Sequence, residues 1–327
     1  GGAYFMEDKI LDILKNSSQH VSGEFLSSSL DVSRTAIWKH IKNLKNKGYL
    51  IEGISNKGYK LLSSPDKINK PDFFSKLKTK ELGRNFIHFD LIDSTNLKAK
   101  ELAKNNCPNG TIIVAEEQSM ANGRFKRVWN SPKGGIWFTL ILRPHIPTSE
   151  APKITQIAAA CIYKTLQELN IDSKIKWPND IHLNNKKLCG ILGEMSCDMD
   201  TINYLAIGIG MNINLDITLL DEEVQKTATS LKNEYNIEFD RNEILANFLN
   251  NFEIEYEKFS KDLNLENTIK ICREHSNIWG KKAKLITYAN EELVTCISLS
   301  NQGDLIIQDA DGNERTVLSG EISFKLD

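Results

Sequence analysis

One segment near the middle of the chain limits its possible folds more than any other. It reads Lys-Trp-Pro-Asn-Asp at positions 176–180 and Lys-Leu-Cys-Gly-Ile-Leu-Gly-Glu at positions 187–194. Short apolar runs bounded by proline and asparagine are typical of strands, so we predict strands at 175–177 and 187–192. Asn184-Asn185 offers a turn between them. The segment therefore predicts two short strands with a turn between them.

Lys187 is the most unusual residue of this segment. Because side chains alternate along a strand, Lys187, Cys189 and Ile191 are expected to share one face. An unpaired charge on an apolar face is unfavourable. Either Lys187 stands at the strand end and reaches water, or an anion meets its ammonium group. Asp180, just beyond the rigid Trp-Pro step, is a candidate for the same site.

Residues 6 to about 62 have the pattern of three helices followed by a hairpin. Ser22 and Ser33 are suited to cap the second and third helices. The sequence Ser-Asn-Lys-Gly at 55–58 is a turn signal between two strand-like runs. The third helix keeps apolar residues at helical spacing, namely Ile37, Ile41 and Leu44. This order resembles a winged helix-turn-helix.

The third helix is basic. Its cations are Arg34, Lys39, Lys42, Lys45 and Lys47, and no acidic residue occurs from position 33 to 47. Such a helix can enter the major groove of DNA, with Arg34 and Thr35 reaching base edges and the lysines meeting phosphates. We predict DNA contacts by Arg34, Thr35, Trp38, Lys39 and Lys42. Alternatively, the lysines form only a solvated face, and Trp38 packs in a core or an interface.

Two further stretches carry polar residues suited to binding. Asp93-Ser94-Thr95-Asn96 opens a predicted helix. These residues either only cap the helix or also aim hydroxyl and amide groups at a polar ligand. A loop at 118–129 holds Gly123, three cations and Trp129 between predicted strands. Arginine forks bind phosphate and a tryptophan face accepts a ring, although a solvated basic loop is the plainer alternative.

The remaining chain completes an α+β pattern. Apolar strands are predicted at 136–142 and 205–214, and amphipathic helices at 149–169 and 241–259. From about residue 281 the pattern changes to short alternating strands, which suggests a small β-barrel. We predict three domains, at residues 1–65, 66–277 and 278–327.

Composition excludes several classes of protein. The formal net charge of the 327 residues is only -2, so any nucleic-acid binding is local. The six cysteines are scattered without Cys-x-x-Cys or Cys/His spacing, so we predict no metal site and reduced thiols in the cytoplasm. No run of eighteen apolar residues occurs, and we expect no membrane partner.

Together, the blocks at 176–180 and 187–194, with those at 93–96 and 208–214, resemble the bifunctional biotin protein ligases that double as biotin operon repressors. The resemblance spans nearly the whole chain. It implies an N-terminal winged helix-turn-helix, a central mixed-sheet ligase domain like that of class II synthetases, and a C-terminal SH3-like β-barrel.

The resemblance also implies an activity. The family converts biotin and ATP, with Mg²⁺, to biotinyl-5′-adenylate and pyrophosphate, and then transfers biotin to a lysine of a carboxylase's biotin carboxyl carrier domain. The adenylate also acts as corepressor by favouring a homodimer on operator DNA. Two alternatives stay open, a lipoate-type ligase and a repressor that senses biotin without catalysis.

Site residues follow from the same resemblance. Those implied to bind biotin are Ser94, Thr95, Asn96, Gln118, Asn122, Gly123, Arg124 and Lys187. Those implied to bind the nucleotide are Arg127, Trp129, Lys176 and Asn212. The implied catalytic residues are Lys187, which holds the biotin carboxylate and then the phosphate, Arg124 in the closing loop, and Asp180 near the carrier lysine.

The chain departs from the family in the loop, whose usual pattern is Q-x-x-G-R-G-R-x-G-R-x-W. Ala121, Asn122 and Lys126 stand at its first Gly, first Arg and third Gly. Fewer glycines stiffen a loop. We expect ligase activity to be kept, because Arg124 and Arg127 remain, while the hold on the adenylate differs.

Overall fold

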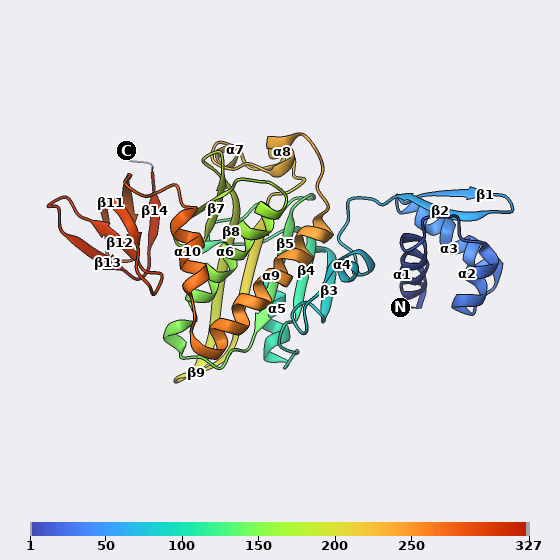
Figure 1. Ribbon diagram of the computed structural model, residues 1–327, viewed down its shortest axis with the longest axis horizontal. Coiled ribbons are helices and arrows are strands. Elements are labelled where there is room, and N and C mark those ends of the chain that lie inside the picture. Colours follow the sequence, from blue (N-terminus) through green and yellow to red (C-terminus); the bar gives the residue numbers. More distant parts are fainter. Residues whose placement is uncertain (1, 325–327) are drawn as a thin grey trace. The chain divides into compact units, whose positions relative to one another are not determined.

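The computed structural model describes residues 2–324 (Figure 1). The chain divides into two compact units. One contains the residues up to Lys76 together with Asp240–Glu243, and the other contains Leu77–Phe239 and the residues from Ile244 onward. Among the described residues, no helix combines the length and the apolar composition needed to cross a bilayer.

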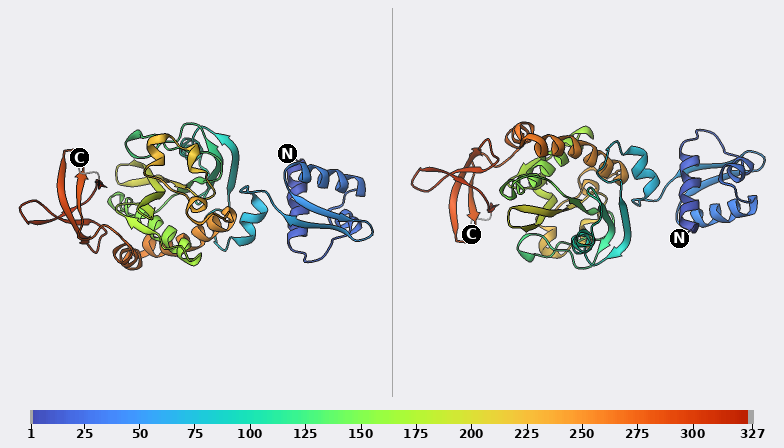
Figure 2. Two further views of the ribbon diagram at one scale, coloured as in Figure 1. Left: turned by 90° about the horizontal axis from the view of Figure 1, so that it is seen from above. Right: turned by 90° about the horizontal axis from the view of Figure 1, so that it is seen from below.

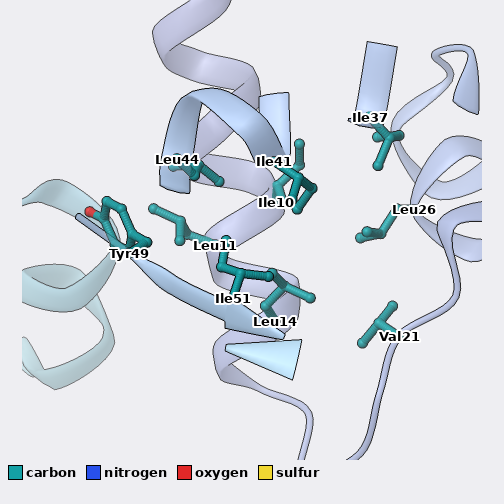
Figure 3. Packing of buried hydrophobic residues seen from close by; sticks show 10 residues of the cluster. All are labelled: Ile10, Leu11, Leu14, Val21, Leu26, Ile37, Ile41, Leu44, Tyr49 and Ile51. Carbon is teal, nitrogen blue, oxygen red and sulfur yellow. The ribbon is translucent and has the colours of Figure 1, made fainter. Parts of the chain in front are cut away.

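The first unit has the predicted order of helices and hairpin. Its elements are α1 (Gly2–Lys15), α2 (Gly23–Leu30), α3 (Arg34–Asn46), β1 (Leu50–Ile54), β2 (Gly58–Ser63) and α4 (Lys70–Lys76). Both predicted caps are confirmed, since Ser22 Oγ accepts the Phe25 N–H at 3.0 Å and Ser33 Oγ accepts the Ala36 N–H at 3.1 Å. Figure 3 shows the apolar core, to which α3 contributes Ile37, Ile41 and Leu44.

A seven-stranded mixed sheet forms the centre of the second unit. Its strands are β3 (Phe86–Ile92), β4 (Ile112–Gln118), β5 (Ile136–Leu142), β6 (Lys174–Lys176), β7 (Asp180–Leu183), β8 (Lys186–Asp198) and β9 (Thr201–Met211). Their order across the sheet is β3-β4-β5-β9-β8-β7-β6. The β3–β4 pair is parallel and the other pairs are antiparallel. The predicted mixed sheet is confirmed.

Different helices cover the two faces of this sheet (Figures 1 and 2). On β5, Phe138 faces Phe248 of α9 (Arg241–Asp262), with ring centroids 5.7 Å apart. Its neighbour Ile141 packs on the opposite face, in a cluster with Ala99 and Ala103 of α5 (Thr95–Lys104). The remaining α-helices of this unit are α6 (Lys153–Glu168), α7 (Glu222–Gln225), α8 (Leu231–Tyr235) and α10 (Glu266–Glu274).

The C-terminal strands form a second sheet. They are β10 (Lys282–Ile286), β11 (Glu291–Leu299), β12 (Leu305–Gln308), β13 (Glu314–Val317) and β14 (Glu321–Ser323). The sheet is antiparallel, with the order β13-β12-β11-β10-β14. The predicted change to short strands near residue 281 is confirmed.

Two predictions about the segment at 176–194 are wrong. A third strand, β7, lies between the two expected ones, so the Asn184-Asn185 turn joins β7 to β8. The pairing of β7 with β8 also contains a bulge, because Ile181 pairs with Cys189 whereas His182 pairs with Lys187. A bulge breaks the alternation of side chains. Lys187 therefore lies beside Gly190 instead of sharing a face with Cys189.

Candidate active site

A cavity of about 230 Å³ opens on the face of the sheet that carries α5. Most of the predicted ligand-binding residues line it. They are Ser94, Thr95, Asn96, Gln118, Asn122, Gly123, Arg124, Arg127, Trp129, Lys176, Asp180 and Lys187. The fold thus brings together residues that are more than ninety positions apart in the sequence.

Three glycines form the floor of the cavity. A Cβ atom on Gly208 of β9 would lie 2.3 Å from Asn96 Oδ1, and one on Gly210 would lie 2.5 Å from Trp129 Nε1. A Cβ atom on Gly190 of β8 would lie 3.0 Å from the Trp129 ring. No side chain fits at the first two positions without displacing a neighbour. Glycine at these positions of the strand therefore lets the Asn96 and Trp129 side chains approach the sheet closely.

One end of the cavity holds a network of uncharged polar groups. The Thr95 N–H donates to Gln118 Oε1 at 2.8 Å, and Gln118 Nε2 donates to Ser131 Oγ at 3.0 Å. The hydroxyl groups of Thr95 and Thr139 are 2.8 Å apart. Ser94 also caps α5, since its Oγ accepts the Leu97 N–H at 3.4 Å. Capping and lining the cavity are therefore compatible roles.

Glu194 orients one member of this network. Its Oε2 accepts a hydrogen bond from Asn96 Nδ2 at 3.2 Å, and its Oε1 accepts one from Lys100 Nζ at 2.6 Å. The Thr139 hydroxyl donates to Asn96 Oδ1. The Asn96 amide is therefore fixed from both sides. Sequence reasoning assigned no role to Glu194 or Thr139, because their contacts depend on strands meeting across the sheet.

The other end of the cavity is charged. Lys187 Nζ lies 3.0 Å from Asp180 Oδ1 and 5.2 Å from the centroid of the Trp129 ring. The Lys187 side chain is 34% exposed and that of Asp180 is 23% exposed. Of the two alternatives open for Lys187, the structure shows the anion beside it, and that anion is a carboxylate of the chain itself.

Burial and neighbouring charges shift the protonation equilibria at this end. Burial raises the pKa of the Asp180 carboxyl, but the ammonium groups of Lys187 and Lys176 outweigh it and leave the net pKa lowered. Burial lowers the pKa of Lys176, and Asp180 offsets part of that shift. Burial and Lys176 lower the pKa of His182 to about 4, so its ring is neutral at physiological pH. Asp180 thus stands as a carboxylate between the amino groups of Lys187 and Lys176.

The loop over the cavity folds as a narrow hairpin. The Gly123 N–H donates to the Arg127 carbonyl at 2.8 Å, and the Trp129 N–H donates to the Ala121 carbonyl at 2.9 Å. At its tip, Phe125 and Lys126 have φ angles of 55° and 56°. Residues other than glycine are strained in this left-handed region. The strain at Lys126 falls at a position where the loop pattern expected from the resemblance has glycine.

Contacts with the C-terminal sheet hold this loop. Arg127 Nη1 lies 2.9 and 3.2 Å from the two carboxylate oxygens of Glu321. The rings of Phe125 and Tyr288 meet edge to face, with centroids 5.8 Å apart. Glu321 and Ile322 also line the cavity. The sequence carries no local signal for these contacts, because Glu321 lies 194 positions after Arg127.

Asn212 is the predicted site residue that the cavity leaves out. Its side chain is buried, and its Nδ2 donates to the Thr229 carbonyl at 3.0 Å. The same segment adds to the edge of β8, since the Lys187 N–H donates to the Thr227 carbonyl and the Thr229 N–H donates to the Lys187 carbonyl. Asn212 thus supports the segment beside Lys187.

A second cavity adjoins the first through Trp177, Pro178 and Ile191, which line both. Asn179 lines it as well. The Asn179 Nδ2 donates to the Ile191 carbonyl at 3.0 Å, while its buried Oδ1 has no hydrogen-bond partner among residues 2–324. A buried acceptor in this state is suited to an incoming donor.

Comparison with known proteins agrees with this geometry. Residues 88–212 match the model of the biotin/lipoate A/B protein ligase family, and residues 7–60 match that of an HTH domain. The bifunctional ligase/repressor BirA of Bacillus subtilis (strain 168) is 40% identical over 244 residues, which are 74% of this chain and 75% of that protein. The BirA of Escherichia coli (strain K12) is 28% identical over 319 residues, 97% and 96% of the two chains.

A solved structure is similar as well. The biotin protein ligase of Aquifex aeolicus in complex with biotin and ATP has a TM-score of 0.64 and 28% identity, covering 73% of this chain and 98% of that one. The fold and the cavity thus define a ligase of the biotin/lipoate class. Within that class, the chain belongs to the bifunctional ligase/repressor BirA family.

Proposed function

We propose that this protein joins biotin to a lysine of a carboxylase's biotin carboxyl carrier domain and also represses transcription in response to biotin. The observation that carries the proposal is the cavity itself. A neutral polar network at one end suits the uncharged biotin head group, and cations at the other end suit its carboxylate and a phosphate.

In the first step, a carboxylate oxygen of biotin attacks the α-phosphorus of ATP. A mixed anhydride, biotinyl-5′-adenylate, forms, and the bond to pyrophosphate breaks. Two anions must approach one another, so Lys187 and Arg124 act by holding and neutralising them. No serine or cysteine nucleophile is needed, because the anhydride is already activated.

ATP, supplied as its magnesium complex, binds beside this carboxylate. Trp129 offers its ring to the adenine, and Arg127 offers its guanidinium to the phosphates. Lys176 lies within the same charged end and adds a further amine. Asn212 acts from outside the cavity, by fixing the Thr229 carbonyl and thereby the segment next to Lys187.

In the second step, the carrier lysine attacks the acyl carbon, the amide forms, and AMP leaves. The second cavity is the route that we assign to the lysine, since it joins the first beside Trp177 and Pro178. Asp180 stays ionised because of its two neighbouring amines, so its carboxylate can hold and orient the incoming amino group by a charge-assisted hydrogen bond.

The Arg127–Glu321 pair provides a test of phosphate binding. ATP must compete with Glu321 for Arg127, whose side chain is 60% exposed. An exposed ion pair contributes at most about 1 kcal/mol, so Glu321→Gln is expected to lower the KM for ATP by up to about fivefold. The matched control is Glu314→Gln on β13 of the same sheet. A KM for ATP that does not change in Glu321→Gln would exclude the competition.

The loop provides a second test. Lys126→Gly removes the strain of a left-handed lysine, about 1 kcal/mol, while Phe125 keeps its own. We expect release of the bound biotinyl adenylate to become about fivefold slower, measured by stopped-flow tryptophan fluorescence. Lys133→Gly, in the same part of the chain but without a positive φ, is the control. Equal release rates in Lys126→Gly and the unmodified protein would contradict the role assigned to strain.

The repressor activity is assigned to the first unit. We propose that Arg34, Thr35, Trp38, Lys39 and Lys42 of α3 bind operator DNA and that the adenylate favours a homodimer on a two-part site. The domain limits that we propose are 1–65, 66–277 and 278–327. Within them the central domain is like that of class II synthetases, and the C-terminal antiparallel sheet closes as an SH3-like barrel.

The ligase proposal is tested by the release of pyrophosphate that depends on biotin, followed by labelling of a purified carrier domain. Turnover with biotin and none with lipoate is the expected result. Turnover with lipoate alone would favour a lipoate-type ligase. Binding of biotin without any pyrophosphate release would favour a repressor that only senses biotin.

A further inference from the structure

Helix α3 exposes a tryptophan on its basic face. The helix buries Ile37, Ile41 and Leu44 in the core of the first unit (Figure 3). Trp38 follows Ile37 in the sequence but lies outside the buried stripe, and it is 56% exposed. A tryptophan is the largest apolar side chain, and on a helix that already has a complete buried stripe it adds nothing to the core. Its exposure leaves the indole ring available to a ligand.

The neighbours of Trp38 indicate the charge of such a ligand. Arg34 is one turn before it and Lys42 one turn after it, so all three share one face of the helix. The Lys42 Nζ lies 5.3 Å from the centroid of the Trp38 ring. Within α3 the charged residues other than histidine are all cations. This face is complementary to a polyanion, and the cation over the ring limits the orientations of the tryptophan.

DNA is a polyanion that also presents an apolar group to a helix lying in its major groove. A helix of this kind lies in the major groove, with its N-terminal half against the base edges. Trp38 belongs to that half. The apolar group that base edges present in the major groove is the C5-methyl group of thymine. We propose that Trp38 reads thymine in the operator by packing on this methyl group, with Lys42 holding the ring.

This inference rests on the proposed repressor function and deepens it. The lysines supply affinity for any DNA through phosphates, while Arg34 and Thr35 reach base edges. Trp38 adds a preference between thymine and bases without the methyl group. The two contributions can be measured separately, because deoxyuridine differs from thymidine by that one methyl group and pairs in the same way.

The experiment uses the full chain with biotin and ATP, and a DNA site that this protein selects from a random pool. Each thymine of the site is replaced in turn by deoxyuridine, and Kd is measured by fluorescence anisotropy at one salt concentration. At one or two positions of each half-site, we expect binding to weaken by about fourfold, the effect of one buried methyl group. Trp38→Ala is expected to bind the two DNAs equally.

Two variants sharpen the result. Trp38→Phe keeps an aromatic ring and is expected to keep most of the discrimination. Lys39→Ala is the matched control, since it is expected to weaken binding to thymine and deoxyuridine sites by the same factor. Thermal unfolding of each variant tests whether the first unit stays folded, which is expected because the substituted side chains are exposed.

Several outcomes would overturn the proposal. One is equal binding of thymine and deoxyuridine sites at every position by the unmodified protein. Another is discrimination that persists in Trp38→Ala. A third is unchanged DNA binding in Trp38→Ala together with lost dimer formation or lost binding to anionic vesicles, which would assign Trp38 to a protein or lipid surface. If the chain selects no DNA at all, the repressor function fails too, so the two failures are distinguishable.

Discussion

Replacing Lys187 by alanine is expected to slow formation of biotinyl-5′-adenylate by at least about 100-fold, the loss typical of removing one group that stabilises developing charge. The ammonium group lies 3.0 Å from Asp180 and over the Trp129 ring, at the charged end of the cavity. Without it, the biotin carboxylate and the α-phosphate repel one another. The measurement is pyrophosphate release under single-turnover conditions.

Lys186→Ala is the matched control for this prediction. Lys186 is adjacent on β8 and exposed, so its loss removes the same charge without changing the cavity. We expect its rate to be within about twofold of that of the unmodified protein. Removal of Lys187 also leaves Lys176 as the one amino group of this pair beside Asp180. Equal rates in Lys187→Ala and Lys186→Ala would mean that Lys187 is structural.

The elements that the sequence predicts well are those defined by local signals. Ser22 and Ser33 cap their helices as expected, because a cap is set by residues within three positions of one another. The apolar spacing of α3 likewise identifies its buried stripe. The lining of the cavity was predicted mostly through family resemblance, since residues brought together from α5, β4, β7 and β8 have no common local pattern.

The features that sequence reasoning missed depend on pairing between distant segments. The bulge that turns Lys187 toward Gly190 exists only in the register of β8 against β7. β7 itself was missed because a strand of four residues has little periodicity to detect. Glu321 approaches Arg127 only once the C-terminal sheet is in place. Asn212 follows the last residue of β9, and its amide already donates to the Thr229 carbonyl.

Gly208→Ala is expected to raise the KM for biotin by at least about tenfold. The new Cβ atom would lie 2.3 Å from Asn96 Oδ1, and Asn96 has little freedom to move because Thr139 and Glu194 hold it. The polar network must therefore shift by a distance that hydrogen bonds do not tolerate. Biotin titrations by calorimetry measure the loss of biotin affinity, and steady-state kinetics measure the rise in the KM for biotin.

Gly193→Ala separates this effect from a general loss of stability. Its Cβ atom would lie 2.7 Å from the Thr155 methyl group of α6, so it also strains the sheet. Gly193 pairs with Ile207, one position from the Gly208 pair, and therefore faces the opposite side of the sheet from the cavity. We expect Gly193→Ala to lower the melting temperature while the KM for biotin stays unchanged.

A double mutant identifies the contact responsible. Asn96→Ala alone removes the atom that the new Cβ would meet, at the cost of one polar contact to the ligand. If the clash is the cause, Gly208→Ala adds little to Asn96→Ala, so the two changes are strongly non-additive. Additive losses would show that Gly208→Ala acts elsewhere, for instance through the register of β9. Such a result would also mean that close approach to Asn96 is not what requires a glycine at the floor of the cavity.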